Sequence, residues 1–192
     1  MRIKQMYLSL GKLARGDPKD TSKPLYFPTG RYNTDRKLEK IIIHWVGPFP
    51  HHTPEGVRQW WENGSDGLGV RASAHYIIKD ENVIQTLPLE EIGRHSGDER
   101  NYYSIGVEVV PMNVAGEFSR QSISSLKELT RRIRFETGLD LKLERHFDGT
   151  QKKDCPRFYT PVVSLLDGGG RTANPEGGNS RWEELKRFIN GE

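Results

Sequence analysis

The chain has 192 residues, which is enough for one domain with a complete hydrophobic core but marginal for two. Its 29 Lys and Arg against 26 Asp and Glu give a net charge of +3, too small and too dispersed to favour nucleic acid as the main partner. The single cysteine excludes an intramolecular disulfide, so the fold can form in a reducing compartment and the thiol is available for other chemistry.

The amino-terminal region predicts neither a signal peptide nor a membrane anchor. Its opening segment, MRIKQMYLSLGKLARGDPKD, lacks the continuous apolar stretch of a signal sequence, and no apolar run of about 18 residues occurs in the chain. We therefore expect synthesis in the cytoplasm and no membrane insertion. Residues 1–37 are polar and rich in turn formers, and we expect them to form an arm that packs on the core.

The first strong strand signal is the run KIIIHW within residues 40–47, where consecutive β-branched residues indicate a buried strand. The prolines of GPFPHHTP then interrupt regular structure. A short helix is predicted over residues 55–63, with Thr53 as its cap and Pro54 in the first helical position.

Two further segments predict strands. Residues 73–88, SAHYIIKDENVIQTLP, alternate apolar and polar side chains on both sides of the turn-forming tetrapeptide KDEN, which indicates a β-hairpin. Residues 102–110, YYSIGVEVV, predict another strand.

Two helices are predicted in the second half of the chain. Between Ser119 and Thr137 apolar residues recur at close to helical spacing, and Gly138 supplies the stop. These apolar residues are Ile123, Leu126, Leu129, Ile133 and Phe135. A Gly-rich connector, DGGGRTANPEGGNS, precedes a closing helix whose apolar side is Trp182, Leu185 and Ile189. The order of elements predicts an α/β fold with a mixed sheet flanked by helices.

A candidate metal site is the segment HFDGTQKKDCP, in which Cys155 follows His146 by nine residues. A thiolate and an imidazole are good ligands for a borderline-soft divalent metal such as Zn²⁺. The best third ligand is His44, which a buried strand would hold rigidly. Three protein ligands are typical of a catalytic zinc because the fourth position stays open. The alternative is that Cys155 is a small buried hydrophobe and the histidines are unrelated.

Glu108 is a candidate general base because it interrupts the apolar strand IGVEVV. A carboxylate among Val and Ile would be desolvated and have a raised pKa. The pattern alone supports equally a solvent-facing glutamate, since Glu108 is opposite in phase to Val107 and Val109.

Five segments occur in the order IIIHWV, SAHYIIKDENVIQTLP, GRHSG, YYSIGVEVV and HFDGTQKKDCP. In this order they resemble the zinc-dependent N-acetylmuramoyl-L-alanine amidases of the amidase-2 and peptidoglycan-recognition-protein superfamily. The resemblance covers roughly residues 38–160, and the closing WEELKRFI helix is also typical of the family. It implies a mixed, mainly parallel sheet with helices on its faces and a zinc groove at one edge, with residues 38–192 as a single catalytic domain.

The resemblance also implies roles for individual residues. His44, His146 and Cys155 match the zinc ligands, so Zn²⁺ is the expected cofactor. Glu108 matches the catalytic glutamate of the family, which favours the functional interpretation of this residue over a solvent-facing one. Some relatives have a catalytic tyrosine where this chain has Ala74, and this departure implies the subgroup that uses glutamate.

Lys153 matches a lysine beside the zinc, where an ammonium can stabilise the oxyanion on the scissile carbonyl. His95, in GRHSG, occupies the position of a loop histidine that is expected to hydrogen-bond the substrate or the tetrahedral intermediate, with a purely structural role as the alternative. His75 and Tyr76 are expected to be packing or hydrogen-bonding residues.

The implied activity is hydrolysis of the amide bond between N-acetylmuramic acid and the L-alanine of the stem peptide. Peptidoglycan is the expected partner, the cell wall the site of action, and a monomer the expected state. Without a signal peptide the chain resembles a phage or prophage endolysin, with a bacterial autolysin or wall-recycling amidase as the nearest alternative. A non-catalytic peptidoglycan receptor commonly lacks the zinc cysteine, and a structural zinc protein would need a fourth ligand.

Overall fold

The computed structural model describes residues 1–8, 37–63, 72–151, 153–161 and 178–192, and these residues fold around one six-stranded mixed sheet. Its strands are β1 (Ile3–Gln5), β2 (Lys40–Trp45), β3 (Tyr76–Lys79), β4 (Asn82–Gln85), β5 (Ser104–Val109) and β6 (Lys142–Arg145). The α-helices within these described ranges are α2 (Pro54–Asn63), α3 (Arg120–Thr137), α4 (His146–Thr150) and α5 (Gly178–Asn190), and the 3-10 helices η1 (Glu99–Tyr102) and η2 (Arg157–Tyr159) lie in the connections.

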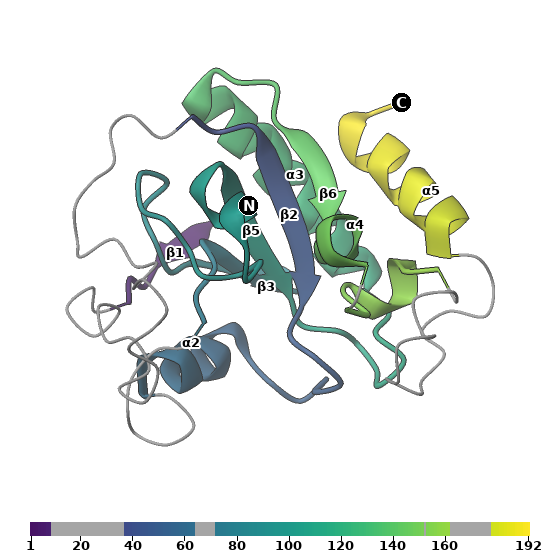
Figure 1. Ribbon diagram of the computed structural model, residues 1–192. Helices are drawn as coiled ribbons and strands as arrows, with labels where there is room; N and C mark the ends of the chain where they lie inside the picture. The colour runs from purple at the N-terminus through teal and green to yellow at the C-terminus, as the bar shows by residue number, and fades with distance from the viewer. Residues whose placement is uncertain (9–36, 64–71, 152, 162–177) are drawn as a thin grey trace, which may run out of the picture.

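The strand order is β1-β4-β3-β5-β2-β6, and every pairing is parallel except that of the predicted hairpin, β3 with β4. This confirms the α/β class and the mixed, mainly parallel sheet. Figure 1 shows β6 and α5 on one side of β2 and β1 on the other. The parallel pairing of β5, β2 and β6 brings the carboxyl ends of these strands to the same edge, which is where α/β sheets bind their ligands.

The edge strands β1 and β6 were not predicted from the sequence. β1 belongs to the region interpreted as an arm, and it pairs with β4 in the register Ile3 to Val83. The rest of that region, residues 9–36, lies outside the described residues. β6 has the sequence KLER, whose three charged side chains carry little strand signal, and it pairs with β2.

The two faces of the sheet differ in chemistry because side chains alternate along each strand. One face of β2 and β5 carries Ile41, Ile43, Ile105 and Val107, and it is covered by buried side chains of α3 and α5. Helix α2 covers the part of the other face that β3 and β4 form, through a second apolar cluster. On this second face β5 presents Ser104, Gly106 and Glu108, and β2 presents His44 after Ile42, so the site is built there.

The helices predicted over residues 55–63 and 119–137 are confirmed as α2 and α3, and their ends show the usual capping contacts. In α2, Thr53 Oγ1 accepts a hydrogen bond from the Gly56 N–H at 3.1 Å. In α3, Ser119 Oγ accepts from the Ser122 N–H at 3.0 Å, and Gly138 ends the helix with a φ of 67°. The prediction that Phe135 belongs to the apolar side of α3 was wrong, because this side chain points away from the sheet and is 87% exposed.

The predicted closing helix is confirmed as α5, with Trp182, Leu185 and Ile189 buried. It begins earlier than predicted, at Gly178, where a Cβ would lie 1.9 Å from the Thr160 carbonyl oxygen. Only glycine therefore allows the start of α5 to pack against this backbone. Residues 167–177, which are most of the predicted connector, lie outside the described residues. None of the described helices is long and apolar enough to cross a membrane.

Candidate metal centre

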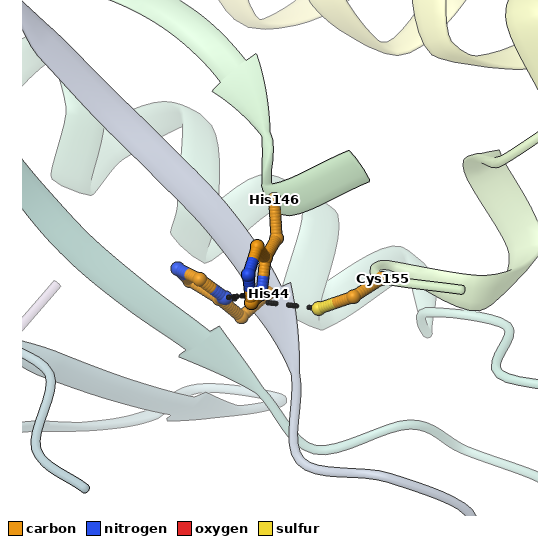
Figure 2. A group of neighbouring side chains, drawn as sticks. All are labelled: His44, His146 and Cys155. Carbon is orange, nitrogen blue, oxygen red and sulfur yellow. Dashed lines mark hydrogen bonds between the residues drawn. The ribbon is translucent and has the colours of Figure 1, made fainter. Parts of the chain in front are cut away.

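The three predicted metal ligands meet at the carboxyl ends of β2 and β6. His44 lies one residue before the end of β2, His146 is the first residue of α4 immediately after β6, and Cys155 lies in the loop before η2. Figure 2 shows the three side chains pointing toward one another. His44 and His146 are 102 residues apart in sequence. The parallel pairing of β2 with β6 brings them together.

The donor atoms have the spacing that a zinc ion requires. His44 Nδ1 lies 3.1 Å from His146 Nδ1 and 3.7 Å from Cys155 Sγ. Around a tetrahedral zinc, standard bond lengths give nitrogen-to-nitrogen and nitrogen-to-sulfur separations of about 3.3 and 3.6 Å. All three donor atoms lie within 4.8 Å of one another, and all three residues are buried. The group therefore fits a divalent metal.

The other ring nitrogen of each histidine has a partner that leaves the inward-facing nitrogen free to bind a metal. His146 Nε2 lies 2.9 Å from the Ser96 carbonyl oxygen, which can only accept, so the ring proton is on Nε2. His44 Nε2 lies 3.0 Å from His95 Nδ1. When Nδ1 of His44 binds a metal, its Nε2–H donates to His95. Such outer partners fix the orientation of histidine ligands in metal sites.

The electrostatics of the group also suit a cation. Burial lowers the pKa of His44 well below its usual value and that of His146 to about 4, so both imidazoles are neutral at pH 7. Burial and the nearby Glu108 raise the pKa of the Cys155 thiol. The protein alone therefore presents neutral donors, and a bound divalent cation would supply the charge that stabilises the thiolate.

The position of α4 is fixed by two buried arginines. Arg145, 5% exposed, forms an ion pair with Asp148 and donates to the Tyr159 carbonyl oxygen. Arg100, also 5% exposed, forms an ion pair with Asp98 at 2.9 Å and donates to the His146 carbonyl oxygen at 3.1 Å. These bonds hold the first turn of α4.

A backbone bond ties the cysteine loop to the same helix. The Phe147 N–H donates to the Cys155 carbonyl oxygen at 2.9 Å. The two arginine contacts and this bond together hold His146 and Cys155 in place.

Glu108 lies beside the ligands, on the face that the alternation of β5 selects. It is the direct register partner of His44, so the two side chains leave adjacent strands on the same face, with backbones about 4.8 Å apart. Burial raises the pKa of Glu108 to about 8, and the charge of Lys153 opposes this increase. No described residue hydrogen-bonds the buried Oε2 atom of Glu108. This carboxyl is therefore poised to exchange a proton near neutral pH.

Lys153 is exposed at the site, and its ammonium is close enough to lower the pKa of His44, His146, Glu108 and Cys155. Its positive charge thus acts on the space between the ligands and Glu108, where an oxyanion would be stabilised.

His95 lies beside His44, on the side away from the other two ligands. It is 9% exposed and contacts His44 at Nε2, the nitrogen opposite to the metal-facing Nδ1. This placement favours the structural alternative for His95. It also leaves the described residues without a fourth protein ligand, because the metal-binding group consists of His44, His146 and Cys155.

His75 is a hydrogen-bonding residue, as expected. Its Nδ1 accepts from the Gly106 N–H at 3.0 Å, and its Nε2 donates to the Glu91 carbonyl oxygen at 2.9 Å. Ser96, Asn101 and Arg100 also support the site but were not predicted. All three make contacts that involve main-chain atoms, and residue type carries no signal of such contacts.

Comparisons with known proteins agree with this geometry. A family model described as N-acetylmuramoyl-L-alanine amidase matches residues 34–158. The N-acetylmuramoyl-L-alanine amidase CwlH of Bacillus subtilis (strain 168) is 32% identical over 89 residues, which cover 44% of this chain and 35% of CwlH. The match therefore spans about a third of the length of that curated relative.

Solved structures show the same fold. The catalytic domain of XlyA superposes with a TM-score of 0.64 at 21% identity, covering 98% of this chain and 99% of that chain. The endolysin N-acetylmuramoyl-L-alanine amidase LysCS from Clostridium intestinale URNW gives a TM-score of 0.61 at 19% identity, covering 98% and 95%.

Proposed function

The chain belongs to the N-acetylmuramoyl-L-alanine amidase family, and from this membership we propose that it hydrolyses the amide bond between N-acetylmuramic acid and L-alanine in peptidoglycan. The observation that carries the proposal is the buried group of His44, His146 and Cys155 with the carboxyl of Glu108 beside it. A metal site with three protein ligands and an adjacent base is the arrangement that metal-assisted hydrolysis requires.

We propose Zn²⁺ as the metal, held by Nδ1 of His44, Nδ1 of His146 and Sγ of Cys155. Two imidazoles and a thiolate suit zinc better than magnesium or calcium, which prefer oxygen ligands. When bound, zinc would polarise the scissile carbonyl and lower the pKa of a water molecule toward neutrality.

Glu108 is the proposed general base and acid. Its carboxylate would take a proton from the attacking water as the new carbon–oxygen bond forms, and would return that proton to the alanine nitrogen as the carbon–nitrogen bond breaks. Burial raises the pKa of Glu108 to about 8 in the metal-free protein, and the charge of a bound cation would lower it, so the carboxyl can accept and release a proton near neutral pH.

Lys153 is proposed to stabilise the negative charge that develops on the carbonyl oxygen. Its exposure leaves the ammonium accessible to a substrate, and its charge already acts on Glu108 and the ligands. We propose that the enzyme is a monomer that acts on the cell wall.

A non-catalytic receptor is the second candidate, but the complete ligand set argues against it because such receptors commonly lack the zinc cysteine. Among catalytic roles we favour a phage or prophage endolysin over an autolysin or recycling enzyme, since LysCS, which shares the fold, is named an endolysin.

The test is digestion of purified peptidoglycan with and without a chelator, with products identified by mass spectrometry. We expect free stem peptides with an L-alanine amino terminus, lost on chelation and restored by zinc. Cys155→Ala should abolish the products and most metal binding, whereas Glu108→Ala should abolish the products with zinc retained. Intact sugar–peptide linkages after treatment with the folded, zinc-loaded protein would refute the amidase proposal and favour the receptor.

A further inference from the structure

Both histidine ligands are supported from behind by consecutive residues of one loop. The loop spans residues 93–98, directly before η1, and we name it the supporting loop. His95 Nδ1 meets Nε2 of His44 at 3.0 Å, and the Ser96 carbonyl oxygen meets Nε2 of His146 at 2.9 Å. A displacement of this short segment would therefore release the outer partners of two metal ligands at once.

One side-chain atom accepts three hydrogen bonds from this segment. Asn101 Oδ1 accepts hydrogen bonds from the His95 N–H at 3.0 Å, the Ser96 N–H at 2.9 Å and the Ser96 hydroxyl at 2.9 Å. Asn101 is 9% exposed, so water would not readily replace these bonds. The backbone N–H groups of His95 and Ser96 thus share one amide oxygen, while the preceding residue, Arg94, is held separately by Ser73.

Strand β5 forms the floor under His95. A Cβ on Gly106 would lie 2.5 Å from two carbon atoms of the His95 ring, so only glycine lets the ring lie against the strand. Beside it, Ser104 Oγ lies 3.5 Å from His95 Nε2 and donates to the Arg100 carbonyl oxygen. Of the sequence SIGVE, the three residues on this face thus support His95, accommodate its ring and supply the candidate base.

From these contacts we infer that Asn101 is a positioning residue of the metal centre, which sets the orientation of both histidine ligands through the supporting loop. The inference deepens the proposed function and rests on the metal site, but not on the substrate. A loop that contacted only one ligand could move with little effect on the orientation of the other. This loop holds both rings, and a lost outer partner typically costs 10- to 100-fold in metal affinity.

The test measures metal binding, independently of peptidoglycan. Zinc affinity is determined by competition with a chromophoric chelator, and the ligand geometry is read from the visible absorption of the cobalt-substituted protein. Asn101→Ala should weaken zinc binding by about 10- to 100-fold and alter the cobalt spectrum. Asn101→Asp keeps an acceptor oxygen at the same position and should restore affinity and spectrum to within a few-fold of the parent.

His95 provides a second pair of variants. His95→Ala removes the acceptor for His44 Nε2, whereas His95→Asn places an amide oxygen near the position of Nδ1. We expect weaker zinc binding in the first variant and partial rescue in the second. The double variant Asn101→Ala with His95→Ala should lose less affinity than the two single losses combined, because both changes disrupt the same support.

Ser125→Ala is the matched control for a general loss of stability. Ser125 is on α3, away from the ligands, and its hydroxyl donates to the Asp80 carbonyl oxygen. Removing this hydrogen bond should leave zinc affinity unchanged. A folded Asn101→Ala protein with parental affinity and spectrum would overturn the inference, as would an Asn101→Asp variant as weak as alanine. If the variants change zinc affinity as expected but the parent protein fails to cleave peptidoglycan, the amidase function is refuted and the positioning role of Asn101 stands.

Discussion

The chemical character of Glu108 comes from its place on β5. The residues on either side, Val107 and Val109, point into the core, whereas Glu108 shares the other face with His44. Burial there favours the protonated carboxyl, and the ammonium of Lys153 opposes it. A surface glutamate with the same neighbours in sequence would have an ordinary pKa, so the site is what gives this residue its reactivity.

Burial of this carboxyl should make the metal-free protein less stable as the pH rises. The pKa of Glu108 is about 8 in the folded protein and 4.5 in the unfolded chain, so between these values the folded state binds more protons. The free energy of unfolding then falls with pH. Glu108→Gln removes this penalty and should stabilise the chelator-treated protein by on the order of 2 to 4 kcal/mol at pH 7.

Denaturant unfolding between pH 4 and 8 measures this difference. The two proteins should have similar stability near pH 4, where the parent carboxyl is protonated in both states, and should diverge above pH 5. A constant difference across this range would show that Glu108 is not buried as an ionisable group.

Lys153 should affect turnover more than metal binding. Removing one donor that stabilises an oxyanion typically lowers kcat by about 10² to 10³, and we expect Lys153→Ala to do so with zinc content unchanged. Lys153→Arg keeps the positive charge and is the control for a local change in shape. Unchanged turnover of the alanine variant on purified peptidoglycan would remove Lys153 from the mechanism.

At the scale of elements, the hairpin of β3 and β4 is attached to the start of α3 by three serines. The Asp80 N–H donates to Ser122 Oγ at 2.7 Å, Ser125 Oγ donates to the Asp80 carbonyl oxygen at 2.7 Å, and Ser119 Oγ bonds the Asp80 carboxylate. Asp80 has a φ of 54° at the turn, where its backbone groups have no partner within the hairpin ladder. The helix therefore stabilises the turn as well as covering the sheet.

Ser122→Ala should destabilise the protein by about 1 to 2 kcal/mol, because it leaves the Asp80 N–H without its acceptor. Zinc affinity should not change, since α3 and the ligands lie on opposite faces of the sheet. Ser124, exposed on the same helix, gives the control: Ser124→Ala should have nearly no effect. Equal stabilities of the two variants in urea would contradict the role of Ser122.

At the scale of the whole molecule, the metal group joins three separate parts of the chain, so metal binding should stabilise the entire domain. Zinc at 100 times its dissociation constant adds about 2.7 kcal/mol to the free energy of unfolding. In a domain of this size that raises Tm by about 5 to 10 °C.

A chelator should reverse this gain in the parent protein, and His44→Ala should abolish the sensitivity to chelator. Differential scanning calorimetry on both proteins, with and without zinc, measures the effect. If the parent, shown to contain zinc, had the same Tm after chelation, the metal group would not link these parts of the fold.

The sequence alone determined much of the fold, because the signals involved are local. The β-branched run before His44, the alternation around KDEN, and the cap and stop of the helix between Ser119 and Gly138 all act within a few residues. The same holds for the donor types: the resemblance assigned His44, His146 and Cys155, and the structure brings these three together. β6 could not be predicted, because its charged side chains carry little strand signal.

Only the tertiary structure decided how these groups act on one another. His44 and His146 meet because β2 and β6 pair in parallel, a pairing of residues 102 apart that no local pattern encodes. His95 supports His44 because the supporting loop places the His95 ring against Gly106. In this position its Nδ1 points at His44 Nε2. Burial and hydrogen-bond direction are properties of the folded chain. Only the tertiary structure could therefore show how the predicted ligands are arranged and which residues orient them.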